Sequence, residues 1–206
     1  RRRHAIHEAG HALITYLDSK DQQPPEYCSV IKRAGTHGLV VRAYDSHERN
    51  SDDLSYQDMT HKIRVALAGR AAEHLILGPL EASARGSLGD LKSATRMAGS
   101  LFGNWGHSVD ISTDKSASSN LAVCIGTPTE SEYAHTEILI RNYLQQQFMD
   151  VINILKSNQH LLLAIIDALN EKTFLFYDEF LDIVKQSKSL SFLYPAQDRK
   201  STRLNS

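Results

Sequence analysis

Residues 4–13 read HAIHEAGHAL and contain three histidines and one glutamate. Because a helix turns once every 3.6 residues, His7 and His11 project from the same face and can reach one metal ion. Glu8 follows His7 directly, so a carboxylate flanks the histidine pair. This is the HExxH pattern, in which the carboxylate takes a proton from water at the open metal position. The stretch therefore predicts a metal-dependent hydrolase, with zinc as the metal and Glu8 as the general base.

The small residues around this pattern add weight to it. A bare HExxH also arises by chance, and the chain has ten histidines. Gly10 lies in the middle of the expected helix, where glycine costs about 1 kcal/mol relative to alanine. Its presence predicts close packing of this helix against another element. His4 precedes the ligand pair by three residues, and we expect it to be a bystander.

A catalytic zinc site needs a third protein ligand, and two downstream carboxylates are candidates. Glu73 lies in the segment AGRAAEH, and Asp90 lies in the segment GSLGDL. Asp90 has an alternative role at the start of a helix, where Ser87 would be the N-cap and Asp90 the acidic residue three positions on. The residues alone leave these alternatives open.

Hydrophobic periodicity predicts a mainly α chain with a small β-hairpin near the active site. Two short strands, with a turn at residues 34–37, would precede the clearest helical pattern, which Gly78 and Pro79 end. Polar connections are expected at residues 45–53 and 107–129. The expected helices cover residues 3–17, 56–77, 87–102, 130–155, 159–170 and 178–186, and the expected strands cover residues 27–33 and 38–44.

Composition narrows the class of protein. A chain of 206 residues with a net charge of −1 gives no electrostatic reason to expect a nucleic-acid partner. Cys28 and Cys124 form no CxxC pair and fit reduced thiols in the cytoplasm. No run approaches the roughly 18 apolar residues of a membrane span, so a membrane would be reached only through an anchor missing from this chain. We therefore expect a location in the cytoplasm or on the cytoplasmic face of a membrane.

Three ordered motifs resemble the peptidase domain of FtsH-type AAA zinc proteases. They are His7-Glu-Ala-Gly-His-Ala12, Gly69-Arg-Ala-Ala-Glu73 and Asp90-Leu-Lys-Ser-Ala-Thr95. The resemblance covers about residues 3–186 and implies that His7, His11 and Asp90 are the zinc ligands and Glu8 the general base. Glu73 would orient a ligand rather than bind the metal. Ala68, His74 and Gly89 depart from the family pattern, and none of these departures removes a ligand.

The resemblance also implies how the chain works. It predicts a zinc-dependent endopeptidase, one zinc per chain, that acts on unfolded or membrane protein substrates. Val30, Ile31, Gly35 and Gly38 match the family's strand pair and would contact an extended substrate. ATP would act only through an N-terminal AAA ATPase module, which we expect to be missing from a chain that begins at Arg1, and the full-length protein would be a homo-hexamer.

Two other functions remain open on the sequence. One is a catalytically silent adaptor or assembly module of the same fold, although Glu8, which such a relative could most simply lose, is present. The other is a stand-alone zinc peptidase that needs no ATP.

The final residues are set apart from the expected peptidase domain, which spans residues 1–190. Residues 191–206 form a tail, and its last nine residues, DRKSTRLNS, resemble the translation of a sequencing adapter. We interpret residues 198–206 as foreign to the encoded protein.

Overall fold

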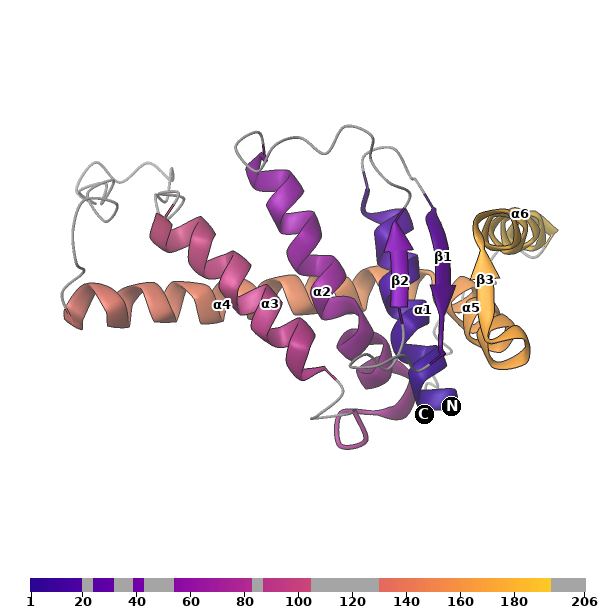
Figure 1. Ribbon diagram of the computed structural model, residues 1–206, viewed down its shortest axis with the longest axis horizontal. Helices are drawn as coiled ribbons and strands as arrows, with labels where there is room; N and C mark the ends of the chain where they lie inside the picture. The colour runs from indigo at the N-terminus through magenta and orange to yellow at the C-terminus, as the bar shows by residue number, and fades with distance from the viewer. Residues whose placement is uncertain (20–23, 32–38, 43–53, 83–86, 105–129, 194–206) are drawn as a thin grey trace, which may run out of the picture.

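The computed structural model describes residues 1–19, 24–31, 39–42, 54–82, 87–104 and 130–193. Helices dominate this part of the chain and one small sheet accompanies them, which confirms the predicted mainly α fold (Figure 1). The elements in order are α1 (Arg2–Leu17), β1 (Pro25–Ser29), β2 (Leu39–Arg42), α2 (Tyr56–Leu77), α3 (Leu88–Gly99), the π-helical turn η2 (Ser100–Asn104), α4 (Glu130–Ser157), α5 (Gln159–Lys172), β3 (Phe174–Phe176) and α6 (Tyr177–Leu193).

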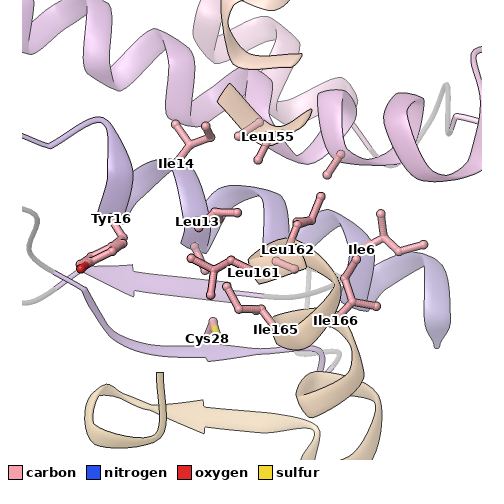
Figure 2. Close-up of a cluster of buried hydrophobic side chains, with 14 of the residues drawn as sticks. Ile6, Leu13, Ile14, Tyr16, Cys28, Leu155, Leu161, Leu162, Ile165 and Ile166 are labelled. Carbon is pink, nitrogen blue, oxygen red and sulfur yellow. The ribbon is translucent and has the colours of Figure 1, made fainter. Parts of the chain in front are cut away.

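The helix that carries HAIHEAGHAL lies at the centre of the molecule. Every residue of α1 from Ala5 to Gly10 and from Ala12 to Tyr16 is buried. Its apolar side chains pack against α4, α5 and the sheet; Figure 2 shows Ile6, Leu13 and Ile14 of α1 beside Leu155 of α4 and Leu162 of α5. A helix enclosed in this way is fixed by packing rather than by its own propensity.

The sheet has three antiparallel strands in the order β2-β1-β3. Strand β1 begins two residues before the expected start, at Pro25, where proline is tolerated because it is the first residue of the strand. Strand β3 was not predicted, because its three residues form a strand only through pairing with Tyr27, Cys28 and Ser29. The expected turn at residues 34–37 and the expected connections at 45–53 and 107–129 lie outside the described residues.

The ends of α2 follow the sequence signals. Ser55 and Asp58 form a capping box, in which Asp58 N–H donates to Ser55 Oγ and Ser55 N–H donates to the Asp58 carboxylate. Gly78 ends the helix with φ of 93°, a value that favours glycine. Ser87 is the N-cap of α3, as predicted, but its side chain makes no capping hydrogen bond. Asp90 instead points to α1, as described below.

The end of the chain and its relation to a membrane complete the description. None of the helices in the described ranges is long and apolar enough to cross a membrane. The predicted tail begins inside α6, which runs to Leu193, and residues 194–206 lie outside the described part of the chain. The interpretation of residues 198–206 as foreign stays a prediction.

Candidate metal centre

Helices α1 and α2 pack against each other at very short range. A Cβ atom added to Gly10 would lie 2.5 Å from the Ala68 carbonyl oxygen and 2.7 Å from the Ala72 Cβ atom. Real Cβ atoms do not approach other atoms so closely, so only glycine fits at this crossing. The close packing predicted from Gly10 is thereby confirmed.

This packing brings polar groups of α2 to the two histidines of α1. The His11 Nδ1 atom lies 2.7 Å from the Val65 carbonyl oxygen, and the His7 Nδ1 atom lies 2.8 Å from Glu73 Oε1. Both partners accept hydrogen bonds, so in the neutral rings each Nδ1 carries the hydrogen and each Nε2 keeps a lone pair. The two Nε2 atoms lie 3.1 Å apart and face the same point.

Asp90 of α3 is the third member of the cluster, although it lies 79 residues after His11 in the sequence. Its Oδ2 atom lies 3.2 Å from His7 Nε2 and 3.6 Å from His11 Nε2. Two ligands bound at about 2.1 Å to a tetrahedral zinc ion are about 3.4 Å apart. Among the residues that the structure describes, His7, His11 and Asp90 form the one group of three or more potential ligands gathered around a common point.

The chemistry of these three atoms favours a cation. In the neutral rings, His7 Nε2 and His11 Nε2 are acceptors, and the Asp90 carboxylate is also an acceptor. With both rings neutral, none of these three atoms carries a hydrogen, and all three are partly buried. A divalent metal ion satisfies such a set, so the residues present fit zinc.

The same arrangement changes the acidity of its members. Burial lowers the pKa of His7, but hydrogen bonds to Asp90 and Glu73 and the charge of Glu8 raise it to about 9. Burial alone would raise the pKa of Asp90, yet contacts with His11 and His7 hold it well below the ordinary range. The pKa of Glu8 is raised, mainly by burial. The cluster attracts positive charge.

Glu8 and Glu73 occupy distinct places around this cluster. Glu8 is 6% exposed and lies on α1, directly after His7 and before His11 in sequence. Glu73 is 2% exposed and contacts His7 through the ring nitrogen that faces away from Asp90. Glu73 therefore lies behind a ligand and not among the converging atoms, in the arrangement expected of a residue that orients a metal-binding histidine.

Two contributors to the site carried no predicted role. Gly69 lies against the metal-facing side of both imidazoles, since a Cβ atom there would lie 2.6 Å from Nε2 of either His7 or His11. Gly69 belongs to one of the three motifs found in the sequence, but its closeness to the histidines is apparent only in the structure. Val65 acts through its backbone carbonyl, for which no side-chain signal exists in the sequence.

The predicted substrate-contacting residues are only partly described. Val30 follows β1, and its N–H donates to the Thr173 carbonyl, 3.1 Å away. Ile31 is 48% exposed, and its N–H donates to Ser29 Oγ. Gly35 and Gly38 lie outside the described residues. Contact of Val30 and Ile31 with substrate stays a prediction.

An HExxH helix whose two histidines meet a distant carboxylate is typical of metal-dependent peptidases. The sequence profile of Peptidase family M41 matches residues 1–183, and the chain belongs to this family.

Similar proteins share the same region. The chain is 34% identical over 108 residues to ATP-dependent zinc metalloprotease FtsH 3 of Conexibacter woesei, and the matched region covers 52% of this chain and 14% of that protein. It is 27% identical over 175 residues to ATP-dependent zinc metalloprotease FtsH of Veillonella parvula, covering 82% and 26%. It is 26% identical over 186 residues to the ATP-dependent zinc metalloprotease YME1 homolog of Schizosaccharomyces pombe, covering 90% and 25%. In these three comparisons the chain spans between about a seventh and about a quarter of the relative's length.

Proposed function

We propose that the chain is the peptidase portion of a zinc endopeptidase that cleaves unfolded or membrane protein substrates. The observation that carries the proposal is the convergence of His7 Nε2, His11 Nε2 and Asp90 Oδ2, which lie within 3.6 Å of one another. His7, His11 and Asp90 would hold one zinc ion. Membership of a peptidase family and the zinc metalloprotease names of the relatives support the assignment.

Glu8 would act as the general base. When zinc is bound, it acidifies a coordinated water molecule and polarises the carbonyl group of the peptide bond. The Glu8 carboxylate takes a proton from the attacking water and delivers it to the leaving amine. Burial supports this role, because it makes the Glu8 carboxylate a better proton acceptor than an exposed one.

Glu73 and Val65 would fix the two imidazoles. Each accepts a hydrogen bond from an Nδ1–H group, which sets the ring orientation and leaves Nε2 free for the metal. Both acceptors belong to α2, so the orientation of the rings depends on how α1 and α2 pack.

An extended substrate would bind at the edge of the sheet. Strand β2 is at one edge of the order β2-β1-β3, so one side of it is unpaired within the described sheet. Backbone hydrogen bonds to such an edge bind extended chains with little sequence preference. Val30, Ile31, Gly35 and Gly38 would line the neighbouring part of the hairpin.

We further propose that ATP hydrolysis drives substrate delivery in a longer, hexameric protein. The relatives are named ATP-dependent, and the chain spans at most 26% of those compared. The free, buried thiol of Cys28 supports a reducing location, in the cytoplasm or on the cytoplasmic face of a membrane. A stand-alone peptidase would instead reach its full rate of peptide cleavage as the isolated chain, without ATP or an attached ring.

Zinc content and proteolysis, measured on the same preparations, test the proposed function. The purified chain is expected to hold about one zinc ion and to cleave a reduced and alkylated protein. Glu8→Gln should keep the zinc and lower the cleavage rate by at least about 100-fold, because a general base is removed without a ligand. Glu137→Gln, an exposed change on α4, is the matched control.

Each contrary result has a separate meaning. A chain that binds less than one zinc ion would contradict the metal assignment. Cleavage at an unchanged rate by Glu8→Gln would contradict the role of Glu8. A chain that binds zinc and cleaves neither the unfolded protein nor short peptides would favour the catalytically silent module.

A further inference from the structure

A second polar cluster joins α1, α2 and α4 away from the metal ligands. Arg64 of α2 donates through Nε to Gln147 Oε1 at 2.7 Å, through Nη1 to Asp18 Oδ1 at 2.9 Å and through Nη2 to Asp150 Oδ2 at 3.1 Å. Each nitrogen of the guanidinium group therefore has its own acceptor. His61 also contacts Asp18, with Nδ1 3.1 Å from Oδ2.

Asp18 is the residue through which this cluster holds α1. It is the C-cap of α1, where the negative end of the helix dipole disfavours a carboxylate. Its side chain is nonetheless only 13% exposed, because Arg64 and His61 offset its charge. The sequence alone indicates no role for His61 or Arg64, since their partners lie 43 and 46 residues away.

The contacts of α2 with Asp18 and with the two histidines of α1 lie along one face of α2. His61, Val65, Gly69 and Glu73 are spaced by four residues and therefore share a face of the helix. From its start to its end, this face meets Asp18, then His11, then both histidines, then His7. The two helices thus run antiparallel, with polar contacts at both ends and the Gly10 crossing between them.

Arg64 immediately precedes the residue that orients His11. The Val65 carbonyl is part of the α2 backbone, so it moves with the helix and has no side-chain rotamer to adjust. A shift of α2 along α1 would lengthen the 2.7 Å contact between Val65 and His11 directly. Such a shift is opposed by Arg64, whose acceptors lie on α1 and α4 and not on α2.

We propose that Arg64 is a positioning residue for the zinc site, which fixes the register of α2 against α1 and thereby the Val65 carbonyl that orients His11. The proposal rests on the proposed function, because it takes His11 as a zinc ligand. Lysine cannot substitute, since one ammonium group cannot direct three separate donors at acceptors on two other helices.

The test compares zinc binding in the full chain with and without the Arg64 guanidinium group. Competition with a chromophoric chelator gives the zinc affinity, and the visible absorption of the Co²⁺-loaded chain reports the ligand geometry. Arg64→Met should weaken zinc binding by about tenfold or more, as the loss of a residue that supports a ligand does, and should shift the Co²⁺ bands. Arg64→Lys keeps the positive charge but should show most of the same loss of zinc affinity and shift of the Co²⁺ bands.

Val184→Ala is the control for a general loss of stability. Val184 is 2% exposed and lies on α6, which carries none of the residues discussed at the metal centre. At a similar loss of Tm, this variant should bind zinc within about twofold of the parent, a difference far smaller than the tenfold effect expected for a support residue.

The outcomes separate the two proposals. If the parent binds zinc and a folded Arg64→Met binds it equally well, the positioning role is wrong and the zinc site stands. If Arg64→Met does not fold, the affinity and spectrum of Arg64→Lys decide by the same criterion. A parent chain that binds no zinc would overturn the proposed function and the positioning role together.

Discussion

Gly10 of α1 lies so close to Ala68 of α2 that a Cβ atom on the glycine would stand 2.5 Å from the alanine carbonyl oxygen. The two backbones therefore approach within the space of one missing methyl group. This contact determines how far the ligands of α1 stand from their partners on α2. The metal centre is thus built on a crossing of two helices.

Gly10→Ala should destabilise the fold. The new methyl group would meet the Ala68 carbonyl oxygen and the Ala72 Cβ atom, which belong to the α2 backbone and its first side-chain atom and cannot rotate away. Overpacking of this kind costs about 1–3 kcal/mol, which exceeds the helix propensity gained. Urea unfolding of the parent and the variant measures the difference, and an unchanged free energy of unfolding would contradict the close crossing.

Gly69→Ala should keep the fold and lose the metal. Its methyl group would meet the rings of His7 and His11, which can turn aside because they are the ends of side chains. The metal-free chain should unfold at a similar urea concentration, while zinc affinity falls by at least about tenfold. Gly89→Ala, where nothing lies within 4 Å of the added atom, is the control and should bind zinc normally.

Replacing each candidate carboxylate separates a ligand from a supporting residue. Asp90→Ala removes one of the three converging atoms and should weaken zinc binding the most. Glu73→Ala removes the partner of His7 Nδ1 and should cost about 10–100-fold in affinity. Full zinc retention by Asp90→Ala would point to Glu73 as the third ligand.

Asp18→Asn should weaken the fold in a pH-dependent way. Burial opposes the charge, but His61 and Arg64 hold the pKa of Asp18 below its ordinary value. A carboxylate with a lowered pKa adds stability above the ordinary pKa of about 3.9 and loses it as the pH falls further. The variant should therefore be about 1–3 kcal/mol less stable at pH 7, and the difference should shrink below about pH 4. Urea unfolding of both proteins at pH 7 and pH 3.5 checks the sign.

Cys28 should be chemically inert in the folded chain. Burial, helped by the charges of Glu8 and Glu179, raises the pKa of its thiol to about 12, and only the thiolate reacts with alkylating agents. In a Cys124→Ser background, iodoacetamide should label Cys28 slowly at pH 8 and rapidly in urea. Rapid labelling of the folded chain would show that β1 opens readily.

The sequence predicted the parts of this molecule that depend on local pattern. Helix α2, its stop at Gly78 and the pairing of His7 with His11 follow from spacing within one segment. Strand β3 was missed because three residues adopt an extended form only beside β1, about 145 residues earlier. Spacing alone left Asp90 as either a helix cap or a metal ligand, and the family resemblance implied a ligand. In the structure the Asp90 carboxylate lies beside His7 and His11.

The supporting contacts were beyond the reach of the sequence for a different reason. Val65 contributes a carbonyl group that every residue possesses, so its identity carries no signal. Arg64 looks like an ordinary surface cation of an amphipathic helix until α1 and α4 are placed around it. Such residues act through geometry that only the assembled helices define.

The pairing of β1 with β3 has a consequence for the growing chain on the ribosome. Helix α1 is synthesised before the elements that enclose it. Two of these elements, α5 and β3, are synthesised more than 140 residues after α1. Contacts such as that of Val30 with Thr173 close a very long loop, and such topologies fold slowly. The histidine-bearing helix must therefore remain without part of its packing until most of this chain has been synthesised.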